Sequence, residues 1–189
     1  MKPQLVISKK RWDREFASGT WNYLDSSPIE RARHAVIGMY CQLLKPAGAI
    51  LDVGCGEGTL FDFLKDTQKR TYVGIDISSE AITKAQKKRS GFFVVSDALE
   101  FRAKKKYDVI VFSEVLYYLD EAAVFEKYRN YLKKNGILIV SLYRTNRHHF
   151  DERVWKSAKK YFKTIDSLEL TGTAKKMKVT WKIALMRKI

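Results

Sequence analysis

The sequence predicts an α/β fold with a doubly wound, mainly parallel sheet of seven strands in a three-layer αβα arrangement. Two observations carry this prediction. Five short apolar runs are separated mainly by helical stretches, an order that is typical of parallel sheets. The C-terminal part then holds two more strand-like runs, 164–171 and 178–186, with Gly172-Thr173-Ala174 between them. This last pattern predicts an antiparallel hairpin at one edge of the sheet.

Length and composition favour a single globular domain. The chain has 189 residues, of which 46% are hydrophobic, enough to bury a sizeable core. We expect an N-terminal cap over residues 1–44, a core over 45–145, and a C-terminal helix and hairpin over 146–189. No apolar run reaches the roughly 20 residues of a membrane helix, and the start lacks the apolar region of a secretion signal. Cys41 and Cys55 indicate reduced thiols in a cytoplasmic protein, with neither a disulfide framework nor a metal site.

The N-terminal part mixes charged and aromatic residues, Trp21 among them, ahead of a clear helix start. Ser27 and Glu30 form a capping-box pattern, with Pro28 at the first helical position. On a helical wheel of this segment, Arg33 falls within the apolar stripe. A guanidinium that faces the core needs an anionic partner. The pattern leaves open whether that partner is Glu30, a core carboxylate or the carboxylate of a ligand.

Strand and helix signals alternate along the next hundred or so residues. An apolar lead-in, 49–53, enters the glycine turn 54–58, and residues 59–64 continue as a helix. Further strands are predicted at 71–76, 92–95, 108–112 and 137–143, and further helices at 78–89, 121–134 and near 151–161. In such a sheet ligands bind at the carboxyl ends of the strands, near the point where the strand order reverses.

Glycines and acidic residues gather at those strand ends. The alternating glycines give a bare backbone that a nucleotide-like ligand can approach closely. Asp76 ends the second strand 22 residues after Gly54, where an acidic side chain can accept both hydroxyls of a ribose. Asp97, after the third strand, is placed to accept from an exocyclic amine such as that of adenine, although each acid alone also suits a helix cap or a turn. The expected binding residues here are Asp52, Gly54, Cys55, Gly56, Asp76, Ile77, Asp97, Ala98, Ser113 and Glu114.

The spacing of these motifs narrows the ligand. No Gly-Lys-Ser/Thr closes the turn, so it is no P-loop, and the alternation of Gly54, Gly56 and Gly58 differs from the G-x-G-x-x-G of dinucleotide sites. The motifs resemble those of the class I S-adenosylmethionine-dependent methyltransferases. Leu51–Gly58 is similar to the first motif of that family, Gly74-Ile75-Asp76 to its acidic second strand and Asp97-Ala98 to its adenine-contact turn. The resemblance implies a Rossmann-like fold, S-adenosylmethionine as cofactor and S-adenosylhomocysteine as product.

A narrower resemblance lies partly outside the core. Residues 21–34 and 114–119 are similar to the nodulation-factor N-methyltransferases, the NodS-like group, and their small-molecule relatives. In that group N-terminal aromatic and basic residues help to enclose the cofactor. The resemblance therefore implies Trp21 as a lid residue and Arg33 as the partner of the methionine carboxylate. It fades after Arg144, so it carries little information about the methyl acceptor.

The catalytic residues are predicted less sharply, because an activated methyl donor needs mainly proximity and orientation from the protein. Candidate bases at the mouth of the site are Glu114, His148 and His149, and Tyr117, Tyr118 and Tyr143 are candidate positioning groups. Glu114 equally suits a role in accepting backbone N–H groups at the start of the following helix. The histidines equally suit a surface loop.

The net charge of +15 lies mainly at the two ends of the chain. Residues 51–100 carry 7 Lys or Arg against 8 Asp or Glu, whereas 141–189 carry 13 against 4. These basic ends would suit an anionic acceptor or nucleic acid, and they equally suit a lysine-rich solvated surface.

The preferred function is methyl transfer to nitrogen or oxygen of a small molecule or glycan, by a monomer or homodimer.

Two other functions are weighed against it. An RNA-directed methyltransferase is the alternative, although Ser113-Glu114-Val115-Leu116 stands where base-amine methyltransferases usually carry an Asn/Asp-Pro-Pro-Tyr motif. A non-catalytic S-adenosylmethionine-binding regulator ranks last, since no motif is broken.

Overall fold

The computed structural model describes residues 7–144, 150–174 and 177–189. Their strands form one sheet in the order β3-β2-β1-β4-β5-β7-β6. The first five strands run parallel: β1 (Ile50–Val53), β2 (Val73–Asp76), β3 (Phe92–Val95), β4 (Tyr107–Ser113) and β5 (Leu132–Tyr143). β7 (Met177–Lys188) pairs antiparallel with both β5 and β6 (Phe162–Ala174). The predicted doubly wound sheet with its antiparallel hairpin is confirmed.

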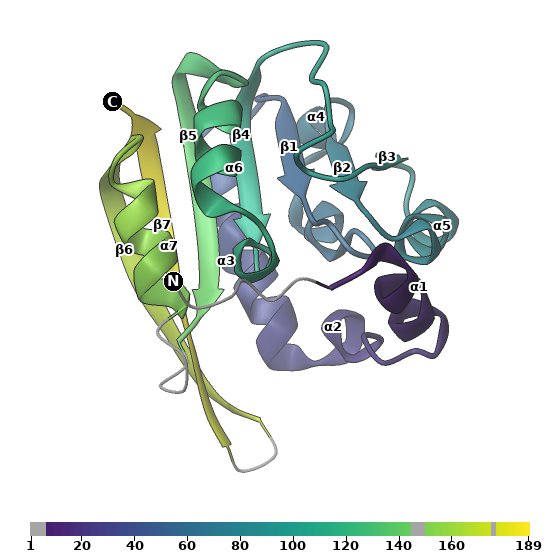
Figure 1. The fold of residues 1–189 in the computed structure, drawn as a ribbon. Coiled ribbons are helices and arrows are strands. Elements are labelled where there is room, and N and C mark those ends of the chain that lie inside the picture. Colours follow the sequence, from purple (N-terminus) through teal and green to yellow (C-terminus); the bar gives the residue numbers. More distant parts are fainter. Residues whose placement is uncertain (1–6, 145–149, 175–176) are drawn as a thin grey trace.

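Helices cover both faces of this sheet and one of its ends (Figure 1). α3 (Pro28–Leu44) and α5 (Ser79–Lys88) pack on one face, together with the 3₁₀ helix η1 (Thr59–Phe63), which α4 (Asp66–Lys69) follows. α6 (Glu121–Arg129) and α7 (Phe150–Ala158) pack on the other face. α1 (Lys9–Ala17) and α2 (Tyr23–Ser26) lie beyond the carboxyl ends of the strands, and the short 3₁₀ helix η2 (Leu116–Tyr118) follows β4 (Figure 1).

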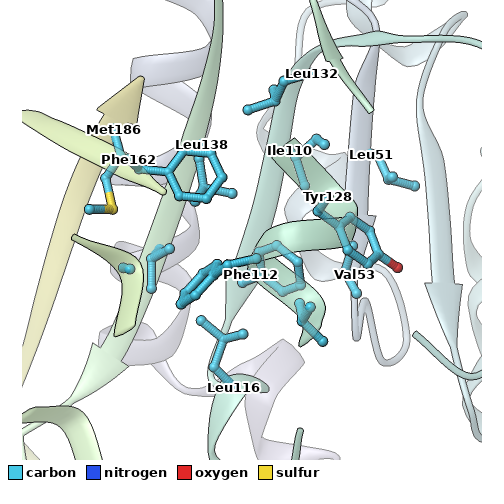
Figure 2. Close-up of a cluster of buried hydrophobic side chains, with 14 of the residues drawn as sticks. Leu51, Val53, Ile110, Phe112, Leu116, Tyr128, Leu132, Leu138, Phe162 and Met186 are labelled. Carbon is cyan, nitrogen blue, oxygen red and sulfur yellow. The ribbon is translucent and has the colours of Figure 1, made fainter. Parts of the chain in front are cut away.

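The strands between these layers are apolar on both faces. Ile50 belongs to the buried apolar cluster that includes residues of α3 and α5, whereas its neighbour Leu51 belongs to the cluster that includes residues of α6 and α7. Figure 2 shows the second cluster, in which the rings of Phe112 and Tyr128 meet edge to face with centroids 5.1 Å apart. Such burial explains why β4 reads as an almost unbroken apolar run. None of the described helices has the length and apolarity to cross a membrane.

The helix predicted over 59–64 is present as a 3₁₀ helix over Thr59–Phe63. Two other predicted boundaries are wrong for identifiable reasons. α6 ends at Arg129 rather than near 134, because Leu132 already pairs with Tyr107 of β4. Gly172 lies within β6 rather than in a turn, and a Cβ there would come within 2.2 Å of the Cδ1 atom of Ile29. The glycine therefore permits close packing of the hairpin against α3.

Candidate active site

A cavity of about 690 Å³ opens at the carboxyl ends of β1, β2, β3 and β4, beneath α1 and α2. Two predicted site residues, His148 and His149, lie outside the described residues. All the others line this cavity: Trp21, Arg33, Asp52, Gly54, Cys55, Gly56, Asp76, Ile77, Asp97, Ala98, Ser113, Glu114, Tyr117, Tyr118 and Tyr143. The sheet topology thus gathers them at the switch point between β1 and β4.

The glycine turn forms one wall of the cavity. Gly54, Gly56 and Gly58 have φ angles of 72°, 54° and 84°, a left-handed conformation that favours glycine. A Cβ on Gly54 would come within 2.5 Å of Val115, whereas a Cβ on Gly56 would meet only the Phe16 ring, at 3.6 Å. The backbone at Gly56 is therefore bare toward the cavity, with a ring of α1 above it.

Asp76 and Asp97 flank this turn and keep hydrogen-bonding capacity toward the cavity. Asp76 accepts the N–H of Gly56 on Oδ2 at 2.9 Å and the N–H of Ser78 on Oδ1 at 2.8 Å. Burial raises the pKa of Asp76. Asp97 accepts the N–H of Leu99 on Oδ1 at 2.6 Å. Because each carboxylate oxygen offers two lone pairs, these turn contacts leave both acids able to accept from a ligand.

Asp52 forms part of the cavity floor and is 4% exposed. Its Oδ2 accepts a hydrogen bond of 2.8 Å from the hydroxyl of Tyr72. Burial raises the pKa of Asp52 to about 7, an effect that the charge of Asp76 adds to and the Tyr72 hydrogen bond opposes. Asp52 is thus a buried acid that can change its protonation state near neutral pH.

Arg33 is only 2% exposed and its guanidinium lies between α3, β4 and β7. Its Nη2 and Nε donate to Glu30 Oε2 at 2.8 and 3.3 Å, its Nη1 donates to Ser113 Oγ, and its Cζ is 5.7 Å from the centroid of the Trp181 ring. The anionic partner that the sequence left open is therefore Glu30. The expected capping box is wrong, because the Ser27 side chain caps no backbone N–H and Glu30 points to Arg33.

Glu114 follows β4 and is the one non-glycine residue with positive φ, 59°, in the described part of the chain. Its Oε2 accepts the N–H of Tyr143 at 3.2 Å and lies 3.3 Å from the hydroxyl of Tyr117, whose one proton is shared with the Tyr143 carbonyl at 3.1 Å. Its predicted alternative role at the start of a following helix is wrong, because the amide that it binds belongs to β5. Its Oε1 is buried without a partner among the described residues.

The environment of Glu114 changes its ionisation. Burial raises its pKa to about 7, although the positive charge of Arg33 opposes this. A strained backbone, a shifted pKa and an unpaired buried oxygen are each unfavourable for stability and tend to mark functional positions. Glu114 is therefore the acid in this cavity best placed to meet a ligand that donates a hydrogen bond.

Aromatic residues that the sequence did not single out, among them Trp12, Tyr23 and Trp181, join the predicted ones in lining the cavity. Ring centroids are 5.0 Å apart for Trp12 and Tyr118, 5.7 Å for Trp12 and Trp21, and 6.1 Å for Trp21 and Tyr23. On the hairpin side, Trp181 lies 6.2 Å from Tyr143. The signal for Trp12 was available, since aromatic residues one helical turn apart share a face, but nothing local to β7 marks Trp181.

Polar contacts fasten the N-terminal helices over the cavity. From α1, Asp13 Oδ1 accepts the hydroxyl of Ser78 at 2.9 Å, and hydrogen bonds from Lys9 and Ser78 lower its pKa to about 2 despite the opposing effect of burial. From α2, Asp25 pairs with Lys88 and Arg89 at 2.8 and 2.9 Å. The roof of the cavity, which α1 and α2 form, is therefore attached mainly to α5 and the segment that follows it.

Comparisons with known proteins agree with this geometry. A family model described as a methyltransferase domain matches residues 44–185. Nodulation protein S of Rhizobium tropici is 35% identical over 115 residues, which cover 59% of this chain and 48% of that protein. A malonyl-[acyl-carrier protein] O-methyltransferase of Halalkalibacterium halodurans is 28% identical over 196 residues, 96% of this chain and 72% of that protein.

Solved structures share the fold over almost the whole chain. The N-methyltransferase NodS of Bradyrhizobium japonicum WM9, in complex with S-adenosyl-L-homocysteine, superposes with a TM-score of 0.75 at 20% identity, over 94% of this chain and 97% of that one. The match to Rhizobium tropici nodulation protein S, by contrast, spans about half the length of that relative. The chain belongs to the methyltransferase domain family and, among the class I S-adenosylmethionine-dependent methyltransferases, is similar to nodulation protein S.

Proposed function

We propose that this methyltransferase transfers a methyl group from S-adenosylmethionine to a nitrogen or oxygen of a small molecule. The observation that carries the proposal is one cavity with two kinds of wall. The glycine turn with Asp76 and Asp97 lies at one end, and a buried carboxylate with an unpaired oxygen, Glu114, lies at the other. An adenosine-containing donor and an acceptor with a removable proton would need these two ends side by side.

The residues present suit each part of the cofactor. Asp76 can accept the ribose hydroxyls and Asp97 the adenine amine, beside the bare backbone of Gly56. Three of the five N–H groups of Arg33 are engaged by Glu30 and Ser113, so two remain for the methionine carboxylate. Trp21 and the other rings of the roof would cover it. When bound, the cofactor supplies a methyl group on a sulfonium, and as the acceptor–methyl bond forms, the sulfur–methyl bond breaks and leaves S-adenosylhomocysteine.

The protein would contribute orientation and a proton acceptor. Glu114 is held by Tyr143 and Tyr117, so that Oε1 is the oxygen left for the acceptor. We assign the proton-accepting role to Glu114 and a positioning role to Tyr117. A role for His148 stays a prediction, because that residue lies outside the described part.

The charge of the cavity argues for a small acceptor rather than RNA. The described residues that line it include seven carboxylates, of which three pair with basic side chains. The four carboxylates that form no ion pair within the described chain leave an excess of negative charge, which repels a phosphate backbone. Both cysteines are free thiols, which supports the expectation of a reducing, cytoplasmic setting.

Thermal unfolding with S-adenosylhomocysteine tests the cofactor half of the proposal. A ligand that binds only the folded protein raises stability by about 2.7 kcal/mol at a hundredfold excess over Kd, so the melting temperature should rise clearly. Glu114→Gln should keep this rise and lose methyl transfer. A melting temperature that does not move at millimolar ligand would contradict the proposal.

A further inference from the structure

The lining of the cavity carries the opposite charge to the rest of the protein. The chain has a net charge of +15. Among the described residues, however, the basic side chains that line the cavity are Arg33 and His34 alone. Burial lowers the pKa of His34 well below its usual range, so it is neutral. The carboxylates of the lining are Asp25, Glu30, Asp52, Glu57, Asp76, Asp97 and Glu114.

Some of these negative charges are already balanced. Glu30 is paired with Arg33, and Asp25 and Glu57 are paired with basic residues of α5 and its C-cap: Lys84, Lys88 and Arg89. Glu114 and the three strand-end acids form no ion pair with a Lys or Arg of the described chain. Asp52, Asp76 and Asp97 lie at the end of the cavity that we assign to the cofactor. Glu114 is therefore the unbalanced acid at the acceptor end.

Around Glu114 the walls are aromatic. Its Oε2 contacts the hydroxyl of Tyr117 and the main-chain N–H of Tyr143, and the Tyr143 ring packs against Trp181 with centroids 6.2 Å apart. Tyr118 extends the wall to Trp12 of the roof, with ring centroids 5.0 Å apart. Ring faces of this kind attract cations and pack against apolar groups, and the Trp181 ring already has the Arg33 guanidinium over it.

Polar side chains other than the tyrosine hydroxyls are few at this end. Arg33, Glu30 and Ser113 are bound to one another, and Glu114 Oε2 is taken by Tyr117 and Tyr143. Among the described residues at this end, the buried non-aromatic polar atom without a partner is Glu114 Oε1, and Arg33 keeps the two N–H groups that we assign to the methionine carboxylate. One such acceptor suits a single donor group on an otherwise apolar molecule, whereas a sugar would bury several hydroxyls with few partners.

We propose that the methyl acceptor is an amine carried on an aromatic or other apolar body, with its nitrogen at Glu114 Oε1 and its apolar part against Trp181 and Tyr143. This inference rests on the proposed function and narrows it from nitrogen or oxygen to nitrogen. It also replaces the anionic acceptor that the basic termini suggested, because those charges lie outside the cavity.

The chemistry balances with the groups present. The acceptor arrives as an ammonium, and its N–H bond breaks as the proton moves to Glu114 Oε1, which leaves the nitrogen with its lone pair. That lone pair forms the new bond to carbon, and the methylated nitrogen carries the positive charge away. The proton on Glu114 returns to water when the product leaves.

A matched set of acceptors tests the proposal in the full-length protein. Phenethylamine, 2-phenylethanol, phenylacetate and glucosamine differ in the donor group or in the body that carries it. Formation of S-adenosylhomocysteine should be fastest with phenethylamine, with a kcat/KM more than about tenfold above that of any other member. Preference for glucosamine, 2-phenylethanol or phenylacetate would overturn the proposal, and so would turnover of none of the four by a protein that binds S-adenosylhomocysteine.

Three variants locate the acceptor at the proposed place. Trp181→Phe, chosen because a buried tryptophan tolerates phenylalanine better than alanine, should raise KM for phenethylamine roughly tenfold, by loss of ring contact, with little change in kcat. Glu114→Gln should lower kcat instead. Trp155→Phe on α7, whose ring has Lys182 over it and lies outside this cavity, should change neither and serves as the control.

Binding of S-adenosylhomocysteine separates the two levels of the proposal. If the wild-type protein shows no stabilisation by this ligand, the methyltransferase function itself fails. If stabilisation is present in the wild type and in all three variants while Trp181→Phe leaves KM for phenethylamine unchanged, only the proposed acceptor site is wrong.

Discussion

The two ends of the cavity are built in different ways. The end that we assign to the cofactor consists of the glycine turn, Asp76 and Asp97, which stand at the ends of three consecutive strands and are held by backbone hydrogen bonds. The acceptor end consists of Trp12, Glu114 and Trp181 with their neighbours, which come from widely separated parts of the chain. The first end follows from local strand–turn–helix geometry, whereas the second exists only once the hairpin and the N-terminal helices are in place.

The largest expected effect comes from a variant that disables the acceptor end and leaves binding at the cofactor end unchanged. Glu114→Gln removes the proton acceptor but keeps an amide oxygen for Tyr143, so kcat should fall by roughly 10²–10⁴. Isothermal titration with S-adenosylhomocysteine should give an unchanged affinity. A parallel loss of affinity would show that Glu114 also belongs to the cofactor end.

The converse change should act on the cofactor end. Asp76→Ala removes a buried carboxylate that can bind the ribose hydroxyls, and such charged hydrogen bonds contribute about 1.5–3 kcal/mol each. We therefore expect affinity for S-adenosylhomocysteine to fall by at least about tenfold in titration calorimetry. Because Asp76 also binds the N–H groups of Gly56 and Ser78, circular dichroism of the variant is the control for folding. Full retention of affinity would contradict the assigned role.

The pH dependence of activity and of stability should run in opposite directions. Glu114, with a pKa of about 7, accepts a proton only when ionised, so kcat/KM should rise as the pH increases through about 7. A carboxyl whose pKa is raised by folding binds more protons in the folded state than in the unfolded state. As the pH rises from about 4 to about 7, each such group therefore lowers the free energy of unfolding by up to about 1.4 kcal/mol per pH unit.

Asp52 can be separated from Glu114 in this experiment. Its pKa is also raised to about 7, but it lies in the floor at the cofactor end, so it should affect stability rather than the activity profile. Asp52→Asn keeps an oxygen that can accept from Tyr72 and should raise the melting temperature at about pH 8 but not at about pH 5. If the pH profile of activity shifts in this variant, the dependence belongs to Asp52 and its assignment to Glu114 is wrong.

The smallest expected effect concerns the roof that spans both ends. Asp25→Asn removes the anion that pairs with Lys88 and Arg89, and partly exposed pairs contribute about 0.2–1 kcal/mol. Binding of S-adenosylhomocysteine should weaken by about two- to fivefold at low salt, and the difference from wild type should shrink at high salt. A difference that salt leaves unchanged would mean that the roof is held by its aromatic contacts instead.

The two ends also differ in how well the sequence predicted them. The doubly wound sheet, the hairpin and the placement of Asp76 and Asp97 at the ends of successive strands were predicted, because apolar periodicity and glycine spacing are local signals. Arg33 was predicted to face inward from its position on a helical wheel, but its pairing with Glu30 was only one of three alternatives. The capping box failed because the carboxylate of Glu30 binds Arg33, one turn further along the same helix, while the N–H of Ser27 bonds to the Tyr23 carbonyl.

What lay beyond prediction depends on pairing between distant segments. Trp181 enters the cavity because β7 pairs with β5 in the register that sets it opposite Tyr143, and a shift of one residue would turn it to the other face. Trp12 enters because Asp13 fastens α1 to the start of α5. The helical spacing of Trp12 and Phe16 shows that these rings share a face, but no local signal shows that this face meets the cavity, and none marks Trp181.

The sequence by itself determined the class of fold, the family and the strand-end placement of the residues that we assign to the cofactor, because each rests on residues close together in the chain whose spacing sets their geometry. The tertiary structure decided the charge and shape of the acceptor end. Burial there raises the pKa of Glu114 and leaves one of its oxygens unpaired, and burial is a property of the whole folded chain. A net charge of +15 thus coexists with a cavity lined by acids, because folding separates the basic surface from the strand ends.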